Sequence, residues 1–137
     1  MLVNGSNFTT IWIESDNQKV KIIDQRLLPH ELKLVTLNTV NDVEFAIREM
    51  QVRGAPLIGV AAAFGMYIAA LENASLEHLS KSADFLLNSR PTAVNLSWAI
   101  KKINLEIKDI NKEDRTNHIL NMAKKIRQDE IEACSNI

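Results

Sequence analysis

Two arginines, each followed by the start of a predicted helix, are the residues of this chain best suited to chemistry. They stand in the segments Arg53-Gly54-Ala55-Pro56 and Ser89-Arg90-Pro91-Thr92. The first turn of a helix offers unpaired backbone N–H groups and the positive end of the helix dipole, and both favour a bound anion. A guanidinium placed there adds a planar fork of donors that fits a phosphate. The sequence therefore predicts an anion site.

The residues around the first arginine fit a close approach of backbone and ligand. Gly54 permits a sharp turn, and Pro56 is tolerated in the first turn of a helix because its missing N–H would have had no partner there. Near Arg90, Thr92 supplies a hydroxyl, and Asn95 follows one turn later. From the residues alone, two plain helix starts with surface arginines explain the same pattern. The convergence of Arg53 and Arg90 on one pocket is the hypothesis to test.

Length and composition indicate a globular domain. The chain has 137 residues, of which 46% are hydrophobic and 24% charged, and its formal charge is −1. This balance, with no long block of like charge, gives no electrostatic footprint for nucleic acid or an anionic membrane. The only cysteine, Cys134, cannot form an intrachain disulfide. A cytoplasmic location is the default expectation, because the first residues do not have the pattern of a secretory signal.

One segment requires a choice between a membrane span and a buried helix. Residues 54–71 contain no charged side chain. They are rich in glycine and alanine, include Pro56 near their start, and contain few of the leucines that drive insertion. We expect a helix at the centre of a bundle, apolar on every face, with small residues that let neighbouring elements approach.

The first third of the chain alternates with the period of strands. Residues 10–14 and 20–24 alternate apolar and polar side chains around a turn-forming tetrad, and residues 32–37 supply a third strand. Helical spacing follows from residue 38, and in the first helix Glu44 and Arg48 can pair on the outer face. The later helices are expected to bury apolar stripes: Leu76, Leu79, Ala83, Leu86 and Leu87; Leu96, Ile100, Ile103, Ile107 and Ile110; and Ile119, Met122, Ala123 and Ile126. Helices are predicted to begin with a capping-box-like Asn41-Asp42-Val43-Glu44, at Pro56, after Ser75, near Thr92 and at residues 111–114. The fold class is α+β, mainly helical. A small antiparallel sheet in residues 1–37 precedes about five helices in residues 38–137, which together form one domain.

Other chemistry-bearing residues do not form a recognisable site. His30, His78 and His118 lack metal-ligand spacing, and Cys134 has no histidine near it in sequence. Trp12 and Trp98 are interpreted as core or interface aromatics. We therefore predict no catalytic residue and no metal site.

Three longer motifs carry a resemblance to a known family. Their order and spacing are similar to those of methylthioribose-1-phosphate isomerases. The motifs are Asp24-Gln25-Arg26-Leu27-Leu28-Pro29, Val52-Arg53-Gly54-Ala55-Pro56-Leu57-Ile58-Gly59 and Ser89-Arg90-Pro91-Thr92-Ala93-Val94-Asn95-Leu96-Ser97-Trp98-Ala99.

The resemblance implies an aldose–ketose isomerase of methionine salvage that uses no metal or organic cofactor and forms a homodimer. It implies that Arg53, Gly54, Ala55 and Arg90 bind a sugar phosphate. The family's catalytic cysteine and aspartate belong to a Rossmann-like domain that has no counterpart here, and Cys134 does not replace that cysteine. We therefore interpret the chain as resembling the amino-terminal domain of a longer enzyme and expect it to show no isomerase turnover by itself.

Two alternatives remain open. One is a non-catalytic regulatory or sensing module, similar to the regulatory subunits of translation initiation factor 2B that are related to this family. The other is a plain helical dimerisation domain, which no phosphorylated sugar would stabilise.

Overall fold

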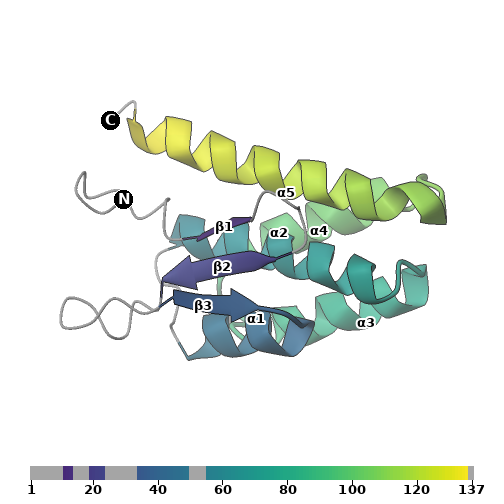
Figure 1. Cartoon of the computed structure of the whole chain (residues 1–137), viewed down its shortest axis with the longest axis horizontal. Helices are drawn as coiled ribbons and strands as arrows, with labels where there is room; N and C mark the ends of the chain where they lie inside the picture. Colours follow the sequence, from purple (N-terminus) through teal and green to yellow (C-terminus); the bar gives the residue numbers. More distant parts are fainter. Residues whose placement is uncertain (1–10, 14–18, 24–33, 50–54, 136–137) are drawn as a thin grey trace.

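A three-stranded sheet leads into five helices. The computed structural model describes residues 11–13, 19–23, 34–49 and 55–135. The strands are β1 (Ile11–Ile13), β2 (Val20–Ile23) and β3 (Leu34–Leu37), and the helices are α1 (Val40–Arg48), α2 (Ala55–Glu72), α3 (Leu76–Leu87), α4 (Val94–Ile107) and α5 (Lys112–Ser135) (Figure 1). This arrangement confirms the predicted fold class.

The sheet is antiparallel throughout, in the order β1-β2-β3. Ile11 pairs with Ile22, and Val20 pairs with Leu37. These four side chains are buried, whereas Lys21, between two of them on β2, is partly exposed. Because successive side chains of a strand point to opposite faces, this alternation gives the sheet one apolar face, which packs on the helices. The predicted turn between the first two strands lies outside the described residues.

The start of α1 differs from the prediction. Its N-cap is Thr39, whose hydroxyl accepts a hydrogen bond from the Asp42 backbone N–H at 3.1 Å, while the Asp42 carboxylate accepts one from the Thr39 N–H at 3.2 Å. The predicted start at Asn41 was therefore wrong, since α1 already begins at Val40. The pattern Thr-x-x-Asp closes a capping box with the shorter acidic side chain. The predicted outer pair of Glu44 and Arg48 is confirmed at 3.0 Å.

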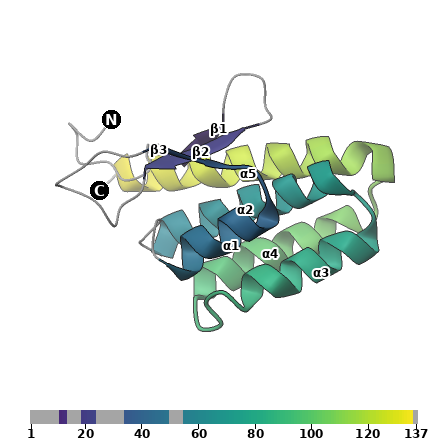
Figure 2. The same cartoon turned by 60° about the horizontal axis from the view of Figure 1, so that its bottom comes forward.

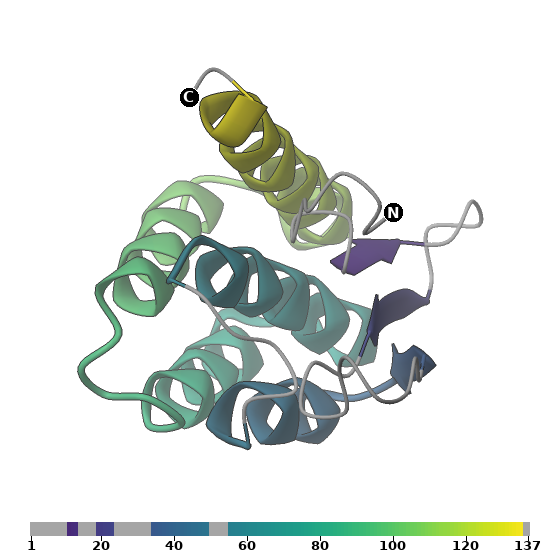
Figure 3. The same cartoon turned by 90° about the vertical axis from the view of Figure 1, so that its left-hand side faces the viewer.

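Helix α2 occupies the centre of the bundle, as predicted. Every residue from 57 to 70 is buried. Figure 3 looks along the helices and shows α2 enclosed by α1, α3, α4 and α5, with the sheet on the remaining side. At Gly65, an added Cβ would lie 2.9 Å from Val43 Cγ1 and 3.0 Å from Leu86 Cδ1, so glycine is needed for α1 and α3 to pack this closely. No described helix is long and apolar enough to cross a membrane.

The outer helices bury most of the predicted stripes, and the exceptions are Leu76, Leu87, which is partly buried, and Ile110. Ser75 caps α3, and Leu79, Ala83 and Leu86 are buried, but Leu76 is 42% exposed. Leu76 is the first residue of α3. Helix α4 buries four residues of its predicted stripe, whereas Ile110 lies beyond the helix and is partly exposed. On α5 the predicted inner residues are buried: Ile119, Met122, Ala123 and Ile126.

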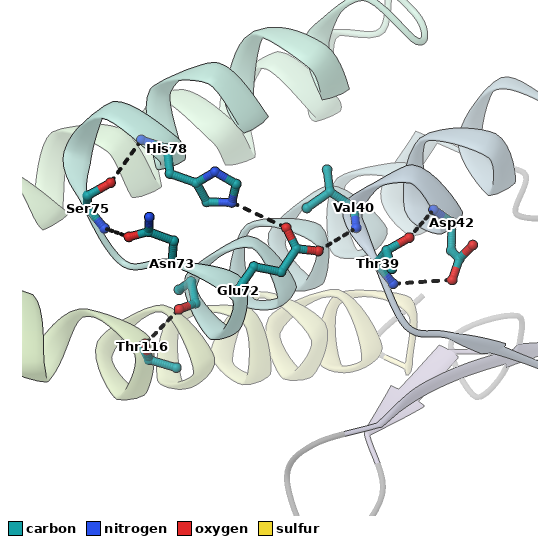
Figure 4. Close-up of polar contacts among 9 residues, drawn as sticks. Thr39, Val40, Asp42, Glu72, Asn73, Ser75, His78 and Thr116 are labelled. Atoms are coloured by element: carbon teal, nitrogen blue, oxygen red, sulfur yellow. Dashed lines mark hydrogen bonds and ion pairs between the residues drawn. The ribbon is translucent and has the colours of Figure 1, made fainter.

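Polar contacts join the end of α2 to α1, α3 and α5. Glu72 accepts a hydrogen bond from the Val40 N–H at 3.4 Å through one carboxylate oxygen, and its other oxygen lies 3.3 Å from His78 Nε2 (Figure 4). Thr116 of α5 donates to the Ala70 carbonyl at 3.3 Å. The negative charge of Glu72 is unfavourable at the C-terminal end of its own helix. It is favourable at the starts of α1 and α3, which the carboxylate contacts here.

An arginine fastens the last helix to the sheet. Arg127 Nε of α5 donates to the Ile11 carbonyl of β1 at 2.7 Å. Figure 2 shows α5 running along the sheet at this level. Burial lowers the pKa of Arg127 from its ordinary value, but an arginine stays protonated at physiological pH.

Candidate functional site

The starts of α2 and α4 lie at the same end of the bundle. Helix α3 returns antiparallel between them, so α2 and α4 run in the same direction (Figure 2). This end faces the viewer in Figure 3, together with the end of α1. The described starts of α2 and α4, which the two predicted motifs adjoin in sequence, thus lie at one end of the bundle.

Gly59 allows the two helix starts to approach. An added Cβ at Gly59 would lie 3.2 Å from the Asn95 backbone oxygen and 3.3 Å from the Asn95 Cβ. Gly59 is in the second turn of α2, and Asn95 is in the first turn of α4. The lack of a side chain therefore brings the positive ends of two helix dipoles close together.

Arg90 bridges the segment before α4 to the end of α1. Its Nε donates to the Ile47 carbonyl at 3.2 Å, and its side chain is partly buried. No ion pair joins Arg90 to a carboxylate among the described residues. A guanidinium has five N–H donors, and in the described part of the chain Arg90 uses Nε for a hydrogen bond and leaves the others for an anion.

Helix α4 begins two residues later than predicted. The Ala93 N–H donates to the Arg90 carbonyl at 3.0 Å, which closes a turn through Pro91 and Thr92. Proline at the second position of such a turn is common because its φ is already set. The helix predicted to begin near Thr92 thus starts at Val94, and Ala93 is the N-cap.

No side chain caps the start of α4. An alanine N-cap supplies no oxygen to accept the first backbone N–H groups, which therefore stay available to water or a ligand. Asn95, which the sequence placed near this site, is partly buried, whereas Thr92 is exposed.

The four predicted substrate-binding residues are described to different degrees. Arg90 is placed as above, and Ala55 is the first residue of α2. Arg53 and Gly54 lie outside the described residues, as does the predicted Asp24 motif. The convergence of Arg53 and Arg90 stays a prediction. The Ile47 carbonyl was not predicted as a partner of Arg90, because no side-chain pattern marks a backbone acceptor 43 positions away.

The two described histidines have structural partners. His78 approaches Glu72 at 3.3 Å, and His118 approaches Glu106 at 3.0 Å. Both pairs lie near the opposite end of the bundle from Arg90. Within the part of the chain that the structure describes, no group of three histidine, cysteine or acidic residues could hold a metal ion.

Comparison with known proteins identifies the family. Residues 51–137 match the family model described as the initiation factor 2 subunit family. Because this match covers more than half of the chain, the chain belongs to that family.

Curated relatives and solved structures confirm the resemblance found in the sequence motifs. The chain is 43% identical to a methylthioribose-1-phosphate isomerase of Sinorhizobium medicae over 96% of its own length and 36% of the relative's. It is 36% identical to the Escherichia coli isomerase, covering all of this chain and 37% of the relative.

Two solved structures share the fold. The 5-methylthioribose 1-phosphate isomerase of Pyrococcus horikoshii is similar with a TM-score of 0.79 and 36% identity, over 85% of this chain and 35% of that one. The delta subunit of translation initiation factor eIF-2B from A. fulgidus is similar with a TM-score of 0.81 and 35% identity, over 90% and 37%. This chain thus spans little more than a third of the length of each of these four proteins.

Proposed function

We propose that this chain is the sugar-phosphate-binding part of a methylthioribose-1-phosphate isomerase. Such an enzyme converts 5-methylthioribose 1-phosphate to 5-methylthioribulose 1-phosphate in methionine salvage, and we assign it to the cytoplasm as a homodimer. The curated relatives named above support this proposal. In this proposal Arg53, Gly54, Ala55 and Arg90 bind the substrate.

The approach of Gly59 to Asn95 is the observation that carries the proposal. It brings two helix starts to one end of the bundle, and Arg90 lies at the same end through its bond to the Ile47 carbonyl. The two helix starts and the remaining N–H donors of the Arg90 guanidinium provide hydrogen bonds and positive potential for a phosphate. Arg53 lies in the sequence between α1 and α2 and would add the second guanidinium.

Phosphate binding accounts for one part of the reaction. A phosphate on the anomeric oxygen prevents simple opening of the sugar ring, so the enzyme must assist opening and then move hydrogen between adjacent carbons. That step requires positioned acid and base groups. In our proposal this chain orients the substrate through its phosphate, and groups outside the chain transfer the protons.

Calorimetry of substrate binding to the 137-residue chain tests the proposal. We expect 5-methylthioribose 1-phosphate to bind, 5-methylthioribose without phosphate to bind at least about tenfold more weakly, and Arg53→Ala and Arg90→Ala each to weaken binding by about tenfold or more. Equal affinities for the phosphorylated and unphosphorylated sugar would contradict the proposal.

Arg115 supplies a matched control for the structural role of Arg90. Like Arg90, it donates to backbone carbonyls, those of Ile110 and Ala74, each at 2.9 Å. It lies at the other end of the bundle, so Arg115→Ala should lower the melting temperature without weakening phosphate binding. If Arg90→Ala and Arg115→Ala reduce binding equally, Arg90 acts through stability alone.

The likeness to the delta subunit of the initiation factor favours one second candidate, a non-catalytic regulatory module. A nucleotide that raises the melting temperature of the chain, while the sugar phosphate leaves it unchanged, would support this candidate. A chain that responds to neither ligand would fit the helical dimerisation domain.

A further inference from the structure

Helix α4 has a second apolar face that the bundle does not bury. Val94, Trp98 and Leu105 are 77%, 50% and 66% exposed. Their spacing of four and seven residues places them on one side of the helix. No described element lies on the side of α4 that faces away from α2 (Figure 3). We call these three residues the outer stripe.

Trp98 stands between two hollows of the surface. One lies beside the turn before α4 and includes Pro91 and Val94 in its lining. The other, of about 400 Å³, lies between α4 and α5, and its lining includes Met122 and Ile126. An exposed indole between two hollows is typical of a surface that another polypeptide covers, because an aromatic anchor and adjacent pockets interlock with a partner.

A second copy of the chain fits this surface poorly. In a two-fold symmetric contact centred between Trp98 and Leu105, residues near the axis face their own counterparts in the other copy. The midpoint between Trp98 and Leu105 falls between Lys101 and Lys102, so the lysines of the two copies would be brought together. Lys102 already lies over the Trp98 ring, with its Nζ 5.5 Å from the ring centroid. A partner with carboxylates around an apolar centre fits better.

We propose that the outer stripe docks on the portion of a methylthioribose-1-phosphate isomerase that lies outside the region matched by this chain. This inference rests on the proposed function, and it adds the surface through which the two portions join. The Sinorhizobium medicae relative has 64% of its length beyond the 36% that this chain covers, so a large partner surface is available. The stripe begins at Val94, beside the uncapped start of α4, and therefore extends directly from the proposed phosphate site.

Acrylamide quenching of Trp98 tests the proposal. Trp12 is replaced by Phe so that Trp98 is the only tryptophan of the chain. The chain is then examined alone and in a full-length hybrid, where it replaces the matched portion of the Sinorhizobium medicae enzyme and tryptophans of that enzyme are changed to Phe. We expect the quenching constant of Trp98 to fall severalfold in the hybrid. In a second, two-chain format, the remaining portion of the Sinorhizobium medicae enzyme is produced as a separate chain and mixed with this one.

Substitutions establish that the stripe itself forms the contact. Trp98→Ser and Leu105→Ser should weaken association in the two-chain format by about tenfold or more. Phe85→Ser, at a residue 39% exposed on α3 and outside the stripe, is the matched control and should leave association unchanged. Circular dichroism of each variant confirms that it is folded.

Two results would overturn the proposal. One is a quenching constant of Trp98 that is as high in the hybrid and in the two-chain mixture as in the chain alone. The other is sedimentation of the isolated chain as a dimer that Trp98→Ser dissociates, because the occupant would then be a second copy. Both readouts are independent of substrate, so protection of Trp98 without sugar-phosphate binding would contradict the proposed function while leaving the docking surface intact.

Discussion

Gly59 of α2 and Asn95 of α4 are in contact through backbone, with 3.2 Å between the position of an added Cβ and the Asn95 oxygen. Alanine at position 59 would gain about 1 kcal/mol of helix propensity but would push the first turn of α4 away. For Gly59→Ala we expect little net change in stability and a loss of about tenfold in affinity for 5-methylthioribose 1-phosphate, because a small displacement misaligns the donors. Urea unfolding and calorimetry measure the two effects. A more stable variant with unchanged affinity would separate this contact from the site.

Gly65→Ala provides the complementary case. Its added Cβ would meet two side chains, Val43 and Leu86, rather than Asn95 at the start of α4. The β-branched Val43 cannot rotate away easily, so we predict destabilisation by about 1 to 3 kcal/mol from overpacking. Sugar-phosphate affinity, measured where the variant is still folded, should remain that of the unsubstituted chain. A loss of affinity in this variant would mean that any strain in α2 reaches the site.

Thr39→Ala removes the side-chain half of the capping box of α1. We expect the free energy of unfolding to fall by about 1 kcal/mol, because the Asp42 N–H loses its acceptor. Thr39→Ser keeps the hydroxyl and serves as the control. Equal urea midpoints for the alanine and serine variants would show that the cap contributes nothing measurable.

Arg127→Ala should loosen the sheet from the helices. The Ile11 carbonyl would lose a charged donor at 2.7 Å, which predicts a loss of about 1.5 to 3 kcal/mol in the free energy of unfolding. Lys125, two residues before Arg127, forms an exposed ion pair with Asp129. Lys125→Ala also removes a positive charge, but it should lower the free energy of unfolding by less than about 1 kcal/mol. Hydrogen exchange of the β1 amides should increase only in the Arg127 variant. Similar unfolding energies for the two variants would contradict this assignment.

The sequence predicts those parts of the fold that depend on local patterns. Alternation of apolar residues predicts the three strands, and the uncharged stretch of residues 54–71 predicts the central helix. Helix starts are less certain, because they depend on which oxygen accepts the first N–H groups. At α1 this acceptor is Thr39, and before α4 the turn closed by the Arg90 carbonyl displaces the predicted start.

Long-range contacts of the candidate site could not be predicted from the same patterns. The small residues of α2 predict that some element approaches closely, but not that Asn95 is the one to meet Gly59. The acceptor of Arg90 is a main-chain oxygen, which every residue possesses and which therefore leaves no trace in the sequence. Trp98 could be interpreted as a core or an interface residue, and its 50% exposure excludes the fully buried interpretation.

The enclosure of α2 has a consequence for how the molecule unfolds. This helix contacts each of the other four as well as β1. Detaching any neighbour would expose apolar surface of a segment that has no polar side to turn toward water. We therefore expect the neighbours of α2 to melt together in a single transition rather than one at a time. A destabilising substitution near either end of the bundle should then shift the same melting transition.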